Sequence, residues 1–159
     1  MADAQALMRR EHIHRLPVLS REKKLIGIVS EKDLLYASPS PATTLNVYEM
    51  SNLLSKLKVD KVMTKEVVTV EEDTLVEDAA RLMVDRNIGG LPVLGDGNLV
   101  GIVTESDIFR LFIELFGTRR KGLRCTLLIP ERVGELASLA SAISERGGNI
   151  ISVGTFPGE

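Results

Sequence analysis

Two short segments of this sequence combine residue types that can hold a ribose and an anionic group. Each has a glycine, two aliphatic residues and a hydroxyl residue, followed three residues later by an aspartate: Gly27, Ser30 and Asp33, then Gly101, Thr104 and Asp107. A glycine lets a ligand approach the backbone closely. The hydroxyl and the N–H groups of a helix start favour an anion, and a carboxylate can accept hydrogen bonds from both ribose hydroxyls.

The same spacing has a structural interpretation. A hydroxyl residue followed three positions later by an acid is close to a capping box, which satisfies only the N–H groups of a helix start. A single copy of the pattern would favour capping. Two copies, each directly after a glycine-bearing apolar segment, favour ligand binding at one or both places.

The two segments belong to an internal repeat. Residues 3–8 match residues 78–83, residues 13–19 match 88–94, and residues 25–33 match 99–107. Such repeats indicate one supersecondary unit used twice. In the second copy we expect, in order, these elements from periodicity and turn signals: a strand at 67–70, a helix at 75–86, a strand at 91–94, a turn at 95–98, a strand at 99–103 and a helix from 105. The first copy has only Met1 and Ala2 ahead of Asp3, so we expect its leading strand to be missing.

Two such units in tandem, over residues 1 to about 116, resemble a pair of cystathionine-β-synthase (CBS) domains, also called a Bateman module. The resemblance implies an α/β (α+β) fold of two strand-helix-strand-strand-helix repeats packed about a pseudo-two-fold axis. It places repeat one with its linker at residues 1–58 and repeat two at 59–118. It also implies clefts that bind AMP, ADP, ATP or S-adenosylmethionine, with no cofactor required. The phosphate and ribose roles fall on Ser30 with Asp33 and on Thr104 with Asp107.

The opposite walls of the two expected sites differ. His14 and Arg15 precede one strand, where the resemblance implies that a basic residue faces phosphates, and Gly89 and Gly90 occupy the matching positions. Arginine offers a planar fork suited to phosphate, although both basic residues could simply face solvent. We expect a more complete second site, with Arg15 reaching across to its ligand. Apolar residues expected to border the clefts, each equally plausible as core, are Ile13, Pro17, Met63, Thr64, Val68, Val70, Ile88, Leu91 and Pro92.

The C-terminal residues 122–159 follow another pattern, with expected strands at 123–129 and 149–153 around a helix. This β-α-β order resembles the first half of a ferredoxin-like ACT domain, in which Gly134, Leu136 and Asn149 would border an amino-acid site. The alternative is that Gly147 and Gly148 only cap a helix. With a linker helix expected at 47–57, the whole resembles the acetoin-utilisation protein B group of bacterial regulators.

Composition narrows the functional classes. The chain has 159 residues, a net charge of −2, 4% aromatic residues, one cysteine and no tryptophan. This net charge does not favour binding to nucleic acid or to membranes. A single cysteine cannot form an intramolecular disulfide, which is consistent with the reducing cytoplasm. His12 and His14 have no acidic partner at metal-ligand spacing, so we expect a regulator and not an enzyme. The helix expected at 108–116 is apolar all round, so other residues must pack against it. We expect a second copy of the chain, in a homodimer, to do so in preference to the C-terminal piece. A ligand-free interaction scaffold serving an unknown regulated protein is the alternative.

Overall fold

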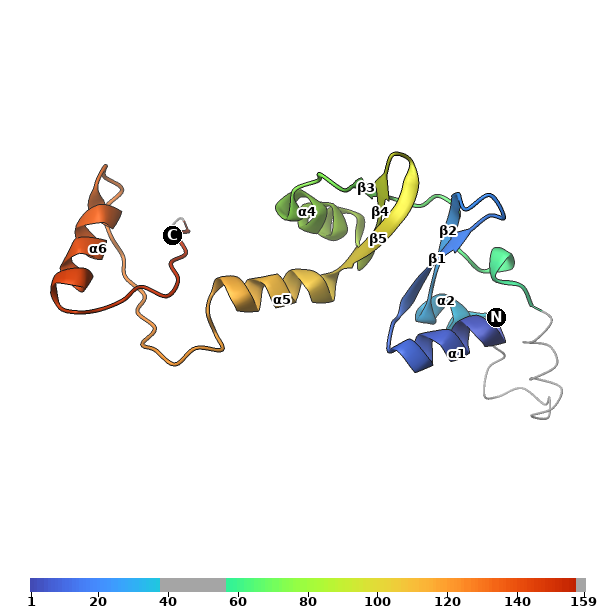
Figure 1. Cartoon of the computed structure of the whole chain (residues 1–159), viewed down its shortest axis with the longest axis horizontal. Helices are drawn as coiled ribbons and strands as arrows, with labels where there is room; N and C mark the ends of the chain where they lie inside the picture. Colours follow the sequence, from blue (N-terminus) through green and yellow to red (C-terminus); the bar gives the residue numbers. More distant parts are fainter. Residues whose placement is uncertain (38–56, 157–159) are drawn as a thin grey trace. The chain divides into compact units, whose positions relative to one another are not determined.

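The computed structural model describes residues 1–37 and 57–156 (Figure 1). The chain divides into two compact units, Met1–Glu105 and Ser106–Glu159, which are described separately. Residues 47–56 of the predicted linker helix lie outside the described residues. No helix in the described ranges is both long and apolar enough to cross a membrane.

The first unit contains the repeat that the sequence predicts. Repeat one consists of α1 (Ala2–Glu11), β1 (Arg15–Leu19), β2 (Leu25–Ser30) and α2 (Glu31–Tyr36). After a short 3-10 helix, η1 (Val59–Lys61), repeat two consists of β3 (Val70–Glu71), α4 (Val76–Arg86), β4 (Gly90–Gly95) and β5 (Asn98–Thr104), and α5 (Glu105–Leu115) follows directly. The helix predicted at 75–86 and the strand pair predicted at 91–94 and 99–103 are confirmed to within one residue at nearly every end.

The two repeats fold the same hairpin twice. In both, the strands are antiparallel, and the register shifts at matching places, between Val18 and Leu19 in β1 and between Val93 and Leu94 in β4. Arg15 is opposite Ser30 in the first hairpin, as Gly90 is opposite Thr104 in the second. Each hairpin therefore brings the start of one strand beside the strand-to-helix junction that carries the serine or threonine.

The helices enter these hairpins through equivalent turns. His12 ends α1 and Asn87 ends α4, and both have a φ of 52° in the left-handed region. The next N–H groups, of Ile13 and Ile88, donate to carbonyls one turn back, at Met8 and Met83. This is the hydrogen-bond pattern of a left-handed helix cap, and it directs residues 13–15 and 88–90 toward the ligand walls that the sequence predicts.

Each repeat buries aliphatic side chains of its helix against its hairpin. In repeat one, Met8, Val29 and Leu34 form the buried cluster, and Val59, Val62 and Met63 pack against it from the segment before repeat two. In repeat two the buried residues are Val70, Ala79, Met83, Leu91 and Pro92. Ala79 and Met83 are four positions apart, which places them on one face of α4.

The edge of the repeat-one sheet is covered in a way that the sequence analysis did not predict. Thr64 exchanges both backbone hydrogen bonds with Ile28, each 2.9 Å long, as an isolated antiparallel bridge. A Cβ placed on Gly27 would overlap the thioether of Met63, so this glycine makes room for the methionine. The strand predicted at 67–70 was placed too early, because only Val70 and Glu71 pair with β4, and they do so in parallel.

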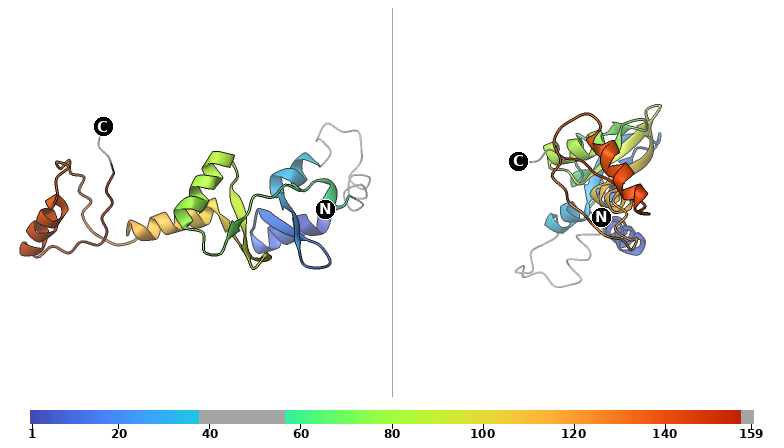
Figure 2. Two further views of the ribbon diagram at one scale, coloured as in Figure 1. Left: turned by 90° about the horizontal axis from the view of Figure 1, so that it is seen from above. Right: turned by 90° about the vertical axis from the view of Figure 1, so that its left-hand side faces the viewer.

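The β-α-β prediction for the C-terminal unit is correct only for its helix. α6 spans Glu135–Glu145, but residues 123–129 and 149–153 have no strand pairing, and the views in Figures 1 and 2 show extended loops on both sides of α6. Leu123 is 98% exposed and Leu128 90% exposed. Two short strands gain too little from mutual pairing without a covering layer, which explains why their β-rich composition did not produce a sheet.

The buried state of Leu91 predicts a large loss of stability on truncation. Leu91 is 0% exposed in β4, whereas Val100 in the paired strand β5 is 57% exposed. Leu91→Ala should lower the free energy of unfolding by about 2–5 kcal/mol, because it removes apolar contacts and leaves a cavity. Val100→Ala is the control and should change it by no more than about 0.5 kcal/mol. Urea denaturation measures both, and equal losses would contradict this core assignment.

Candidate ligand-binding site

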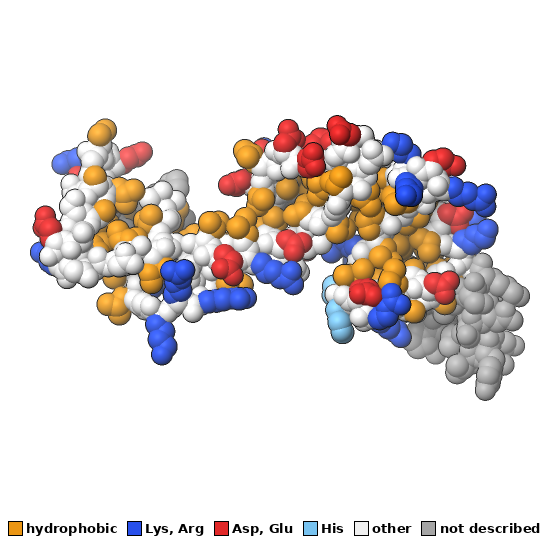
Figure 3. All heavy atoms as spheres, in the orientation of Figure 1, with side chains coloured by type: hydrophobic (Ala, Val, Ile, Leu, Met, Phe, Trp, Pro, Cys, Tyr) orange, Lys and Arg blue, Asp and Glu red, His pale blue; other side chains and the backbone are white. Residues whose placement is uncertain are grey.

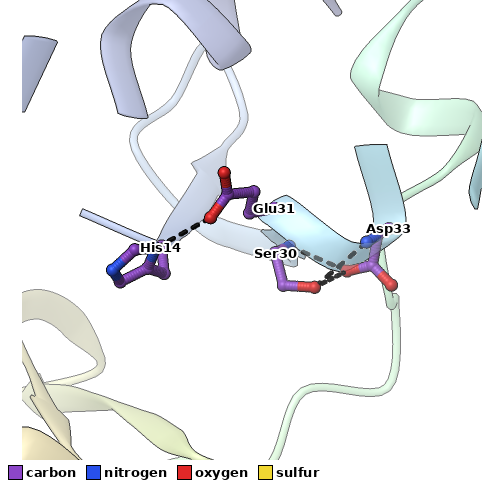
Figure 4. A network of polar contacts seen from close by, with 4 residues as sticks. All are labelled: His14, Ser30, Glu31 and Asp33. Carbon is purple, nitrogen blue, oxygen red and sulfur yellow. Dashed lines mark hydrogen bonds and ion pairs between the residues drawn. The ribbon is translucent and has the colours of Figure 1, made fainter. Parts of the chain in front are cut away.

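The strand-to-helix junction of repeat one forms a complete capping box. The hydroxyl of Ser30 accepts a hydrogen bond from the Asp33 N–H at 3.2 Å, and Asp33 Oδ2 accepts from the Ser30 N–H and hydroxyl, both at 2.7 Å (Figure 4). The two side chains that could hold phosphate and ribose are thus engaged with each other and with the start of α2. A ligand at this junction would have to compete with these hydrogen bonds.

His14 is also engaged within repeat one. Its Nδ1 lies 2.8 Å from Oε2 of Glu31, the first residue of α2, and Figure 4 shows the two side chains directed at one another. The backbone brings them together, because the Glu31 N–H donates to the His14 carbonyl. Both side chains are more than half exposed, so the pair contributes little to stability, but it occupies the position where His14 was expected to meet a phosphate.

Arg15 lies differently, because its side chain reaches from repeat one onto the glycine wall of repeat two. A Cβ placed on Gly90 would lie 3.2 Å from Cδ of Arg15, and one placed on Gly89 would overlap its Nη2. A larger residue at position 89 would therefore displace the guanidinium. The two glycines leave the space that Arg15 fills, whereas from the sequence we expected Arg15 to reach a ligand beside this wall.

Arg15 is half-buried, and its guanidinium lies near the carboxylate of Glu105 without forming an ion pair with it. Among the described residues it forms no hydrogen bond or ion pair. Burying a cation without a partner is costly, and a guanidinium is well shaped to bind a carboxylate or phosphate in two places. The arrangement is a cationic group held over bare backbone, which is suited to an anionic ligand.

The hydroxyl junction of repeat two borders the same wall. Thr104 ends β5 opposite Gly90, and its Cγ2 would lie 3.4 Å from a Cβ on that glycine. The N–H of Glu105, the first residue of α5, donates to the Gly89 carbonyl at 3.3 Å. Asp107 follows in the first turn of α5 and forms an ion pair with Arg110 at 3.3 Å. Gly89, Gly90, Thr104 and Arg15 thus surround one place.

The apolar candidates divide between core and surface. Leu91 and Pro92 are fully buried and Val70 is in the repeat-two core, while Met63 packs on repeat one and Thr64 pairs with Ile28. These five have structural roles that favour the core interpretation, and their ligand contacts remain a prediction. The partly accessible candidates are Ile13, Pro17, Val68 and Ile88.

The expected amino-acid site in the C-terminal unit lacks its framework. Gly134 precedes α6 with a φ of 91°, a left-handed conformation that suits glycine, and its carbonyl accepts from the Ser138 N–H. Leu136 and Asn149 are exposed. Because the flanking strands do not form, Gly134 functions here as a helix start, and the strand edges that would border such a site are missing.

Glu105 is the residue that the sequence analysis did not single out. Its Oε2 would lie 2.5 Å from a Cβ on Gly89, beside the Arg15 guanidinium. The repeat itself contained the signal, because Glu105 matches Glu31, and both glutamates directly follow the hydroxyl residue. The pattern from which the site was predicted consists of the glycine, the hydroxyl residue and the aspartate, and it does not include the glutamate that follows the hydroxyl residue.

Comparison with known proteins identifies the family. The family model for the CBS domain matches residues 1–40 and 59–114, more than half of the chain. The chain belongs to the CBS domain family. This CBS pair is similar to the solved structure of CBSX2 in complex with AMP, with 32% identity, a TM-score of 0.59, and coverage of 72% of this chain and 84% of that one.

Two further CBS structures are similar to this one. The CBS pair of protein MJ0100, solved with 5′-methylthioadenosine and S-adenosylmethionine, shares 30% identity at a TM-score of 0.55 and covers 75% of this chain and 82% of that one. A Vibrio cholerae protein assigned to acetoin utilization shares 34% identity at a TM-score of 0.58, with coverage of 74% and 79%. The mixed α/β fold of the first unit is thus that of a CBS domain pair.

The capping box of repeat one predicts a measurable stability effect. Ser30→Ala should lower the free energy of unfolding by about 1 kcal/mol, because α2 loses its side-chain cap and Asp33 loses a donor. Ser144→Ala is the matched control, since Ser144 is exposed in α6 and its hydroxyl forms no hydrogen bond with the described residues. Chemical denaturation compares the two variants. Equal stability of both would show that the Ser30 contacts contribute nothing to folding.

Proposed function

We propose that this chain is a regulatory module that binds an adenosine-containing ligand between its CBS repeats, beside Gly89 and Gly90. The ligand class includes AMP, ADP, ATP and S-adenosylmethionine. The single observation that carries the proposal is the position of Arg15, a half-buried cation that crosses from repeat one to the glycine wall of repeat two and forms no hydrogen bond or ion pair with the described residues.

Each part of the proposed site has a distinct role. Arg15 binds the phosphate or carboxylate, since its fork can form two parallel hydrogen bonds. Gly89 and Gly90 have no side chains, which lets the Arg15 side chain lie against the wall where it would meet the ligand. Thr104 and, three residues further on, Asp107 take the anion and ribose roles that the family resemblance implies. We assign the ligand to repeat two first, because the Arg15 side chain lies against the glycine wall of that repeat.

The similar structures support the ligand class. CBSX2 was solved with AMP, and the CBS pair of MJ0100 with 5′-methylthioadenosine and S-adenosylmethionine. All three compounds share adenosine and differ in what is attached to the 5′ carbon. A site with a common nucleoside position and a variable 5′ end fits this range, and in the present chain we assign Arg15 to the 5′ end of a charged ligand.

The proposed mechanism is regulatory and not catalytic. A ligand that contacts both Arg15 of repeat one and the wall of repeat two ties the repeats together about their pseudo-two-fold axis. It changes the signalling state only if it binds one arrangement of the repeats more tightly than another. The similarity to the Vibrio cholerae acetoin utilization protein supports a role in a bacterial catabolic pathway. A regulated partner protein then responds to the change in the arrangement of the repeats.

We further propose that the module forms a homodimer through α5. Phe109 is 68% exposed, and Phe112 and Leu115 are also exposed on this helix. Within the second unit, Ser152 donates to the Leu115 carbonyl at the C-terminal end of α5, and Gly154 lies beside the Phe116 ring. Figure 3 shows apolar side chains open to solvent on this unit. An apolar patch of this kind is typical of a protein interface. The alternative function, a scaffold that binds no ligand, would use the same interface.

Removing the cation at the site predicts a large loss of affinity. Arg15→Ala should weaken AMP binding roughly 10- to 100-fold, because a hydrogen bond to a charged group contributes about 1.5–3 kcal/mol. Arg21→Ala is the control, since it removes the same charge from the exposed turn between β1 and β2. Isothermal titration calorimetry measures both variants. An unchanged affinity in Arg15→Ala would refute the site, and no binding of any adenosine compound would favour the scaffold.

The dimer proposal predicts an effect confined to the apolar face of α5. Phe109→Ser should shift the protein toward monomer, since it removes an aromatic side chain from the proposed interface. Glu114→Ser, on the same helix, should leave the dimer intact. Sedimentation equilibrium gives the masses of both. A parent protein that is monomeric, or a dimer insensitive to Phe109→Ser, would contradict the proposed interface.

A further inference from the structure

Opposite charges from the two repeats meet over Gly89. Nη2 of Arg15 and Oε2 of Glu105 both lie next to the point where a Cβ of Gly89 would be. They are close neighbours, yet they form no ion pair with one another, and within the described part of the chain neither side chain has another polar partner. The site therefore presents a separated cation and anion to whatever binds there.

The internal repeat explains why Glu105 lacks a partner. Its counterpart Glu31 pairs with the ring of His14 at 2.8 Å. In repeat two the position of His14 is occupied by Gly89, which has no side chain. The backbone hydrogen bond is retained in both repeats, from Glu31 to His14 and from Glu105 to Gly89. The backbone of Glu105 is thus held in the same way as that of Glu31, but the imidazole partner is missing.

We propose that Arg15 and Glu105 together select an adenosine ligand that carries an α-amino-acid group, as S-adenosyl amino acids do. This proposal rests on the proposed function and names its ligand class. The α-carboxylate binds the guanidinium of Arg15, and the α-ammonium binds the neighbouring carboxylate of Glu105. In an α-amino acid the two groups share one carbon, so a single ligand end reaches both side chains.

Phosphate ligands fit this pair less well. A phosphate chain satisfies Arg15 but brings further negative charge beside Glu105, and like charges at a few ångströms repel one another. The penalty grows from AMP to ATP. Glu105 is therefore a specificity-determining residue, which disfavours polyphosphates and favours a zwitterion.

Two thioethers of adenosine test the proposal directly. S-adenosylhomocysteine carries the α-amino-acid group and 5′-methylthioadenosine lacks it, while both share the nucleoside and the sulfur. Calorimetric titration of the full chain should show tighter binding of S-adenosylhomocysteine than of ATP. Glu105→Gln should weaken S-adenosylhomocysteine roughly tenfold, the loss of one charge-assisted contact, and change 5′-methylthioadenosine less than about twofold.

Controls separate charge selection from other effects. Glu77→Gln removes the same charge at the far end of α4 from Gly89 and should leave both affinities unchanged. Glu105→Lys should invert the preference, so that ATP binds more tightly than S-adenosylhomocysteine. Equal shifts of both thioethers in Glu105→Gln, no shift at all, or ATP as the tighter ligand of the parent would overturn the proposal. If no adenosine compound binds the parent, the proposed function itself has failed.

Discussion

The space over Gly89 and Gly90 is the constraint on which the proposed site depends. Any side chain at position 89 would collide with the Arg15 guanidinium and lie against Glu105. Because Gly89 and Gly90 have no side chains, the charged side chain of Arg15 can reach from repeat one onto repeat two. The hairpin registers make this possible, because Arg15 and Gly90 each begin a strand opposite the hydroxyl junction of their own repeat.

The same constraint makes the two halves of the module unequal. Repeat one satisfies its charged groups internally, through the Ser30–Asp33 capping box and the His14–Glu31 pair. Repeat two has glycine in place of the histidine, and the matching glutamate keeps only its backbone hydrogen bond. The two repeats therefore differ in the partner of this glutamate, which is the His14 ring in repeat one. In repeat two a bound ligand would supply that partner.

The sequence was sufficient to predict the repeat, its hairpins and the reach of Arg15. These depend on signals in the sequence itself. They are the apolar face of residues 76–86, the turn residues at 95–98, and the glycines Gly89 and Gly90 at the repeat positions that match His14 and Arg15. Features that depend on tertiary pairing were not predictable. The Thr64–Ile28 bridge joins segments that are far apart in the chain, and the strands expected at 123–129 and 149–153 have the right composition but no covering layer.

Glu105 shows a different limit of sequence analysis. Its residue type was visible, and its equivalence to Glu31 follows from the repeat. Its significance depends on a distance, because a glutamate at a helix start is ordinarily a favourable neighbour of the helix dipole. Only the coordinates show that it lies against the same glycine as Arg15.

A crystal structure of the chain with S-adenosylhomocysteine bound would test the central claim most directly. The account predicts electron density for the ligand against Gly89 and Gly90, with its charged end within hydrogen-bond distance of the Arg15 guanidinium. Density beside Ser30 and Asp33 with the glycine wall empty, or a ligand at the wall with Arg15 turned away from it, would contradict the account.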